Sequence, residues 1–227
     1  MESEKSKNIR LFLHCARCGD LEGVKFDIEK KNVDVNSTDN IGRTALHEAA
    51  YGEGGNDYSR YNEVVEYLIS KGAEIDKKTE CDDPKRSGAT PFSYAVMQGK
   101  VDVAKTLTKH GANTKVIVNG FNFLDLAINS DNPEIIKLAL GYGYDIDQYG
   151  VSQATPLVNA LSSGYCESVK FLLESGADYK KYCSGDNLSP LSCAAQEKKT
   201  KWKMYKASIR TRREKRRKRK TFRIHKF

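Results

Sequence analysis

Small sets of apolar residues recur along the chain, each spanning about one helical turn. The sets are Val64, Val65 and Leu68; Val103, Ala104 and Leu107; Ile135, Ile136 and Leu138; and Val169 and Leu172. Because this spacing places the apolar side chains on one side of a helix, we predict four amphipathic helices. Each set is followed by a glycine, at position 72, 111, 143 or 176, where a helix commonly ends in a left-handed residue.

A second pattern recurs upstream of these helices and predicts a shorter helix. Its copies are GRTALHEAA (42–50), GATPFSYAV (88–96), GFNFLDLAI (120–128), QATPLVNAL (153–161) and NLSPLSCAA (187–195). Thr44, Thr90 and Thr155 suit a helix N-cap. Pro91, Pro156 and Pro190 suit the first turn, where no N–H is needed. A small residue recurs at one position (Ala49, Ala95, Ala127, Ala160 and Ala194), so we expect close helix contacts there.

The spacing of the two patterns identifies a repeat. Position 88 to Gly111, Gly120 to Gly143 and position 153 to Gly176 each span 23 residues, and successive copies begin 32 or 33 residues apart. A period of about 33 with these motifs resembles the ankyrin-repeat family over roughly residues 8–195. The segment CARCGDLEGVK (15–25), followed by VDVN (33–36), resembles a first repeat that lacks its opening hairpin.

The resemblance implies an all-α repeat solenoid with short β-hairpin fingers. It also implies a non-enzymatic module that binds a protein partner on the concave face formed by the fingers and inner helices. We expect a flexible N-terminus (1–7), a repeat domain (8–209) and a disordered tail (210–227). A helix over about 197–210 is expected to close the stack, because Trp202, Tyr205 and Ile209 share one helical face.

The chain departs from the family pattern at a recurring histidine and in two insertions, and the insertions suggest contact residues. Only the copy at 42–50 keeps the histidine (His47) that looks like a helper of loop hydrogen bonds in such repeats. Residues 51–62 carry seven extra residues and 77–87 about six. Polar insertions of this kind are either tolerated surface loops or specific contacts, and both interpretations stay open. If they make contacts, the candidates are Tyr58, Arg60, Tyr61, Lys85 and Arg86.

Charge separates the C-terminal segment from the rest of the chain. Residues 197–227 hold 16 basic and 2 acidic residues, whereas residues 1–196 hold 22 basic and 28 acidic residues. Nine of the eleven residues in RTRREKRRKRK (210–220) are basic. Three interpretations remain open: a nuclear import signal, phosphate contacts with nucleic acid, or a solubilising end. The residues concerned are Arg212, Arg213, Lys215, Arg216, Arg217, Lys218, Arg219 and Lys220.

The sequence offers no recognisable catalytic set. Cys15 and Cys18 form a CxxC pair with His14 beside it, but a structural zinc site needs four ligands. We therefore interpret these cysteines as small thiols in a helix. No signal peptide and no apolar run of about 18 residues is present. We expect no cofactor, no metal, no membrane partner, and a monomeric intracellular protein, cytoplasmic, nuclear or delivered into a host cell.

Overall fold

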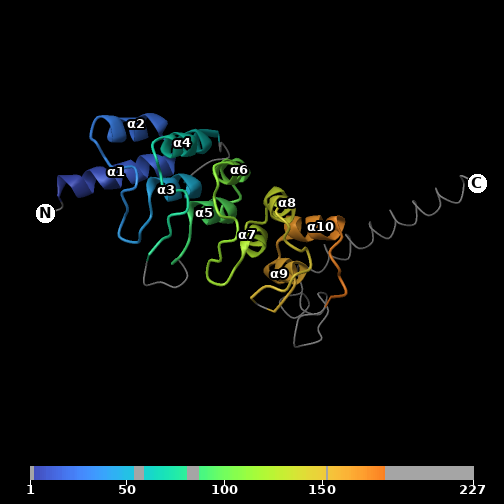
Figure 1. The fold of residues 1–227 in the computed structure, drawn as a ribbon. Helices are drawn as coiled ribbons and strands as arrows, with labels where there is room; N and C mark the ends of the chain where they lie inside the picture. Colours follow the sequence, from blue (N-terminus) through green and yellow to red (C-terminus); the bar gives the residue numbers. More distant parts are fainter. Residues whose placement is uncertain (1–2, 54–58, 81–86, 152, 182–227) are drawn as a thin grey trace, which may run out of the picture. The chain divides into compact units, whose positions relative to one another are not determined.

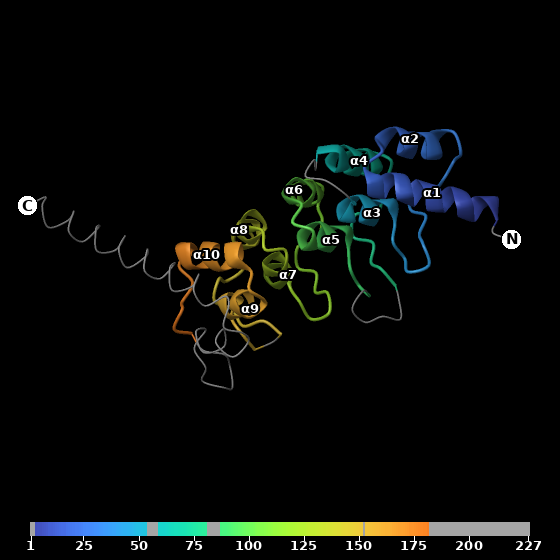
Figure 2. The same cartoon turned by 180° about the vertical axis from the view of Figure 1, so that it is seen from behind.

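The structure is a computed structural model that describes residues 3–53, 59–80, 87–151 and 153–181. It contains two compact units, Met1–Ser130 and Asp131–Phe227, which we describe one at a time. The described residues form ten α-helices joined by loops (Figures 1 and 2). Their only β-pairing is an isolated antiparallel bridge between Val118 and Phe121. The all-α repeat architecture predicted from the sequence is confirmed.

In the first unit, seven helices form two layers. The inner layer contains α1 (Glu4–Cys18), α3 (Ala45–Tyr51), α5 (Pro91–Met97) and α7 (Phe123–Asn129), each packed on the next. The outer layer contains α2 (Leu21–Glu29), α4 (Ser59–Ser70) and α6 (Val101–Lys109), which pack in the same order. The loops between repeats all project from the inner layer on one side, below the inner helices in Figure 1.

The second unit contains α8 (Pro133–Gly141), α9 (Pro156–Ser163) and α10 (Cys166–Ser175). Helix α10 packs against both α8 and α9. Asp131, which precedes α8, accepts hydrogen bonds from the backbone N–H and the hydroxyl of Ser168, both at 2.9 Å. These bonds join the helix pair of one repeat to that of the next.

The predicted helix starts and stops are confirmed where the structure describes them. Thr90 and Thr155 cap their helices through the side chain, and Pro91 and Pro156 occupy the first turn. Asn122 caps α7 through its side chain, which accepts the Asp125 N–H at 3.1 Å. Gly72, Gly111, Gly143 and Gly176 all have positive φ, between 85° and 107°. Backbone torsions of this kind end each outer helix and turn the chain towards the next repeat.

The core follows the predicted pattern with one exception. Ala49, Ala95, Ala127 and Ala160 are fully buried, as expected for contacts between neighbouring inner helices. Leu138 is only half-buried, because the next residue, Ala139, occupies the fully buried position of α8. A small side chain there brings the backbone of α8 close to its neighbours.

Two expectations about the chain ends need comment. Helix α1 begins at Glu4, four residues before the expected start of the repeat domain, so the predicted boundary between residues 7 and 8 falls inside this helix. The Ser3 hydroxyl accepts the Ser6 N–H at 3.2 Å and caps this helix. The predicted closing helix (197–210) and the copy at 187–195 lie outside the described residues.

Candidate functional site

The first unit presents a surface on which loops and inner helices meet, and we call it the inner-helix face. Its side chains are Arg17 on α1, Arg43 in the loop before α3, Glu48 and Tyr51 on α3, and Tyr94 on α5. Glu48 and Tyr94 hold equivalent positions in two successive repeats. The repeat therefore stacks these positions side by side. Glu48 and Tyr94 are buried, at 2% and 9% exposure, whereas Arg17, Arg43 and Tyr51 remain partly exposed to a partner.

A buried carboxylate organises one end of this face. Glu48 is 2% exposed. Its Oε2 accepts a hydrogen bond from Arg17 Nε at 2.5 Å, and its Oε1 lies 3.1 Å from Arg43 Nε. Arg43 Nε also donates to Asp39 at 2.8 Å, and Arg17 Nη1 donates to Glu53 at 3.0 Å. Burial of a carboxylate is tolerable here because two guanidinium groups pair with it.

The two arginines are held in place but remain partly open to solvent. The side chains of Arg17 and Arg43 are 26% and 25% exposed. The pKa of Arg17 is raised, first by its hydrogen bond to Glu48, so its positive charge persists at any ordinary pH. The result is a pair of fixed positive charges beside a carboxylate that they already neutralise in part.

Aromatic rings continue the face from α3 to α5. The ring centroids of Tyr51 and Tyr94 are 6.1 Å apart with an interplanar angle of 79°, and Tyr94 also meets His47 edge-on at 5.6 Å. The Arg17 guanidinium carbon lies 5.7 Å from the Tyr51 ring centroid. Edge-to-face rings and a cation above one of them restrict these side chains to defined positions.

His47 links two repeats from inside the stack. The Thr44 N–H donates to His47 Nδ1 at 3.1 Å, and His47 Nε2 lies 3.2 Å from the Ala89 carbonyl oxygen. These partners require the tautomer protonated on Nε2. Burial lowers the pKa of His47 to about 4, so the ring is neutral near pH 7. The sequence-based interpretation of His47 as a helper of loop hydrogen bonds is confirmed.

The structure places only two of the five predicted contact residues. Tyr58, Lys85 and Arg86 lie outside the described residues. Tyr61 is 1% exposed, and its hydroxyl donates to the Glu53 carbonyl oxygen at 2.6 Å. Its ring is packed inside the repeat and offers no surface to a partner. Arg60 is exposed, and its Nη2 donates to the Tyr61 hydroxyl at 2.8 Å.

Tyr61 instead forms a junction with the next repeat. Lys100 Nζ lies 3.7 Å from the Tyr61 ring centroid and donates to the Ala49 carbonyl oxygen at 3.4 Å. Burial, followed by the charge of Arg60, lowers the pKa of Lys100 to about 8. Gly52 has a φ of 52°, and a Cβ there would collide with Lys100 Nζ and the Tyr61 ring. Only glycine fits at that position.

The described residues give no support for metal chemistry. Nowhere in the described ranges do three His, Cys, Asp or Glu side chains gather to hold a metal ion. Cys15 and Cys18 are half-buried free thiols on α1, as predicted, and burial raises the pKa of Cys15. His14 Nε2 lies 3.6 Å from Cys18 Sγ, which is a local contact along one helix. None of the described helices has the combination of length and apolar character needed to cross a bilayer.

The basic residues Arg212, Arg213 and Lys215 to Lys220 lie outside the described residues. Their interpretation as an import signal, a phosphate-binding segment or a solubilising end stays a prediction.

The sequence analysis missed the cluster around Glu48. A usable signal was present, because the equivalent residues in the later copies are Tyr94, Leu126 and Asn159, none of them acidic. A lone carboxylate in a row of uncharged inner-helix residues predicts a cationic partner nearby. The partner in the loop, Arg43, is five residues upstream, but Arg17 belongs to another repeat and only the stacking of the helices brings it close.

The profile of the family described as ankyrin repeats (three copies) matches residues 4–79, 58–150 and 118–183. The chain belongs to the ankyrin-repeat family. Its matched segments cover all ten helices of the described residues, including α1 and α2, which the sequence analysis assigned to a first repeat.

Several relatives carry similar sequences. Alpha-latrocrustotoxin-Lt1a of Latrodectus tredecimguttatus is 34% identical over 139 residues, which cover 60% of this chain and 9% of the toxin. The ankyrin repeat protein nuc-2 of Neurospora crassa is 36% identical over 121 residues, 51% of this chain and 10% of that protein. The putative ankyrin repeat protein FPV223 of fowlpox virus is 31% identical over 147 residues, 63% of this chain and 93% of the viral protein. The chain thus spans about a tenth of the first two relatives.

Solved structures confirm the fold. The human ASB11 ankyrin repeat domain superposes with a TM-score of 0.69 and 24% identity, covering 87% of this chain and 82% of that domain. A second match has a TM-score of 0.66 and 26% identity, covering 86% of this chain and 96% of the matched chain. The matched chain belongs to a structure of the predatory endopeptidase Bd0816 from Bdellovibrio bacteriovorus in complex with the immunity protein Bd3460.

Proposed function

We propose that this protein acts by binding another protein on the inner-helix face of its first unit, without catalysing a reaction. Ankyrin repeats are generally protein–protein interaction modules, and repeat arrays use the surface formed by their stacked units. The observation that carries the proposal is that the partly exposed side chains of Arg17 and Tyr51 are held in place by the buried Glu48 and Tyr94. Arginine and tyrosine are the residue types enriched at the energetic centres of interfaces.

The side chains of this surface are already held in place before a partner binds, which also favours it as the binding site. Arg17 is fixed by Glu48 and lies over the Tyr51 ring, and Tyr51 is fixed in turn by Tyr94. Side chains that are already ordered lose little conformational entropy when a partner binds. One of the matched structures is itself a complex of two proteins, an endopeptidase and an immunity protein, which is compatible with a role in binding.

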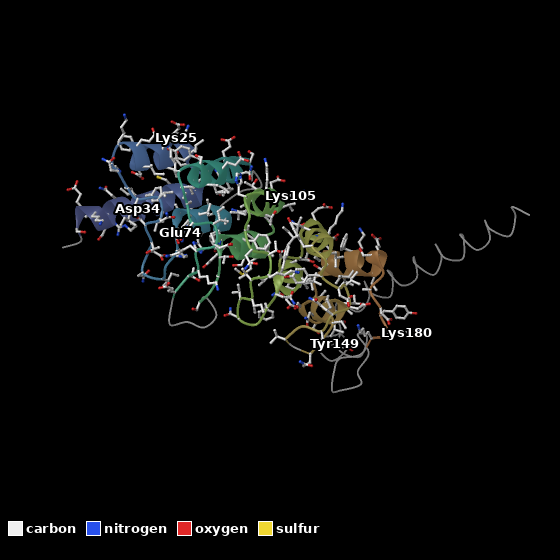
Figure 3. All side chains as sticks on the ribbon, in the orientation of Figure 1. Lys25, Asp34, Glu74, Lys105, Tyr149 and Lys180 are labelled. Carbon is white, nitrogen blue, oxygen red and sulfur yellow. The ribbon has the colours of Figure 1, made fainter. Side chains whose placement is uncertain are left out.

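Site-specific photocrosslinking tests this function. A photoreactive phenylalanine analogue is placed at Asn129, the exposed residue of the inner helix α7 that is equivalent to Tyr51 in the repeat, and in a second variant at Lys105 of the outer helix α6 (Figure 3). Both variants are expressed in the cells that make the protein and irradiated. We expect a discrete crosslinked protein from position 129 and none from position 105. Equal crosslinking from both positions, or crosslinking from 105 alone, contradicts the proposal.

The basic segment motivates a second candidate function, association with nucleic acid or with an import receptor. Nine basic residues within eleven would bind phosphate with a steep dependence on salt. A chain ending at residue 209 separates the two functions. If nuclease treatment leaves the position-129 crosslink intact in both chains, binding belongs to the repeats. If the crosslink disappears in the shorter chain, the tail is the main binding element.

A further inference from the structure

The hydrogen bonds of Arg17 and Arg43 leave part of each guanidinium unused. Arg17 donates from Nε to Glu48 and from Nη1 to Glu53, and Arg43 donates from Nε to Asp39. Among the residues that the structure describes, neither Arg17 Nη2 nor Arg43 Nη1 donates a hydrogen bond. Both side chains are about a quarter exposed, so these groups can be reached from solvent.

We propose that Arg17 and Arg43 together recognise a carboxylate of a protein partner, and that Glu53 occupies Arg17 until the partner displaces it. The inference rests on the proposed function and adds the chemistry of the partner to it. Guanidinium groups match carboxylates in shape and charge, and a fixed guanidinium gives the strongest and most selective pairing. Glu48 supplies that fixation, since its two oxygens contact one arginine each.

Local charge decides which carboxylate can be exchanged. Three acidic groups, Asp39, Glu48 and Glu53, surround the two guanidiniums, so an added anion is repelled unless one of them leaves. Glu48 is buried and cannot leave without unpacking α3. Asp39 holds its loop together, accepting the Ile41 and Arg43 N–H groups at 3.0 and 2.9 Å.

Glu53 is the group that can move. Its side chain is 55% exposed and, among the described residues, makes one ion pair, to Arg17 Nη1 at 3.0 Å. The Glu53 N–H donates separately to the Arg17 carbonyl oxygen at 2.9 Å, so the backbone stays in place when the side chain rotates away. The exchange therefore replaces one carboxylate by another on Arg17 and leaves the net charge unchanged.

Tyr51 defines what should accompany the partner's carboxylate. The Arg17 guanidinium carbon lies 5.7 Å from the Tyr51 ring centroid, and Tyr94 packs against the edge of that ring. The residue next to an acidic side chain bound to Arg17 would therefore lie beside the Tyr51 ring. The site thus fits a segment in which an aspartate or glutamate is next to an apolar residue.

Peptide selection followed by binding measurements tests the proposal. A displayed library of random dodecapeptides is selected on the full-length protein, and the enriched peptides are measured by fluorescence anisotropy. We expect an acidic residue beside an apolar residue in the enriched set. Arg17→Gln should weaken binding by about tenfold or more, as expected for loss of a charged hydrogen-bond donor. Glu53→Gln should strengthen binding several-fold, because the competing carboxylate is gone.

Lys105→Gln is the matched control, since it removes one positive charge from an exposed position of α6 and should leave binding unchanged. Arg17 also pairs with the buried Glu48, so circular dichroism checks the fold of Arg17→Gln. If that variant is unfolded, Glu53→Gln decides alone, because the ion pair that it changes is with the partly exposed Arg17 and its backbone contacts stay the same. Enriched peptides without acidic residues, equal affinities of Arg17→Gln and Lys105→Gln, or weaker binding by Glu53→Gln each overturn the proposal.

The crosslinking experiment separates this inference from the function on which it rests. A crosslink at position 129 together with peptides that ignore Arg17 keeps the inner-helix face as a binding surface and rejects the carboxylate. If no crosslink forms at position 129, both the binding function of the inner-helix face and the recognition of a carboxylate are rejected.

Discussion

The ammonium nitrogen of Lys100 lies 3.7 Å from the centroid of the Tyr61 ring. Lys100 is the N-cap residue of α6, and Tyr61 belongs to the first turn of α4, so the contact joins two successive repeats. Both side chains are at most 2% exposed. Tyr61 lies within the segment 51–62 that carries the extra residues, and the contact fixes the start of the helix that follows them.

Lys100 should make stability depend on alkaline pH. Burial lowers its pKa to about 8, below the value of about 10.4 for an exposed lysine. Between these values the unfolded chain binds more protons than the folded chain, so the free energy of unfolding rises as pH increases from 8 to 10.5. Relative to Lys100→Met, we expect the native protein to gain about 1–3 kcal/mol over this range, measured by urea denaturation.

Lys105→Met is the control for this comparison, because it removes an exposed lysine of the same helix. The difference between the pH responses of Lys100→Met and Lys105→Met isolates the buried site from the loss of a lysine charge on this helix. A parallel pH response of the native protein and Lys100→Met would show that Lys100 is solvated and has an ordinary pKa.

His47 should make stability depend on pH with the same sign as Lys100, but in the acidic range. Its pKa in the folded protein is about 4, below the unfolded value of about 6.5, because protonation is costly in its buried site. The unfolded chain therefore binds more protons between pH 6.5 and 4, and the folded state loses stability as pH falls through that window. Relative to His47→Gln, we expect a loss of about 3 kcal/mol by pH 4.

The measurement is urea denaturation of both proteins at pH 7 and pH 4.5. Asp39 and Arg43 also act on the His47 ring, and both remain in the variant. The difference between the two proteins therefore isolates the imidazole. If His47→Gln loses as much stability on acidification as the native protein, other groups cause the acid sensitivity.

The repeat itself could be predicted from the sequence because its signals are local. A threonine or asparagine caps a helix within its own turn, and a glycine such as Gly111 ends a helix through its own backbone torsion. The contacts between repeats could not be predicted. Arg17 and Glu48 are 31 residues apart, and nothing in either local segment indicates that stacking brings them together.

Tyr61 was predicted to be a contact residue, but its side chain is buried. Its residue type suggested an accessible interface residue, because tyrosine in an insertion has both a polar and an apolar side. In the structure Tyr61 begins a helix, and its position corresponds to that of Lys100 in the next repeat. A residue that belongs to the repeating frame faces the neighbouring repeat, and counting back from Val64 and Val103 would have revealed this equivalence.

Glu48 should be needed for the stability of the first unit. Glu48→Gln leaves two guanidiniums without their shared buried carboxylate, and loss of one member of a buried ion pair commonly costs several kcal/mol. Since both arginines are partly solvated, we expect a loss of about 2–4 kcal/mol in the free energy of unfolding. Arg17→Met and the double variant complete a thermodynamic cycle, measured by urea denaturation.

The cycle distinguishes pairing from packing. If Arg17 and Glu48 interact directly, the double variant should lose less stability than the sum of the two single variants. Strict additivity would mean that Arg43 alone satisfies Glu48.

Asp131 should stabilise the second unit by capping a helix from outside it. Its Oδ1 accepts the N–H and hydroxyl of Ser168, near the start of α10, whose own N-cap residue Tyr165 makes no side-chain cap. Asp131→Ala removes this acceptor and places alanine at a φ of 49°, where a residue with Cβ is strained. We expect a loss of about 1–2 kcal/mol in the free energy of unfolding.

Asparagine tolerates the same torsion and keeps an acceptor oxygen, so Asp131→Asn should lose much less stability than Asp131→Ala. Urea denaturation of both variants measures the difference, and an equal loss would assign the effect to charge, since both variants remove the carboxylate but only one removes the acceptor.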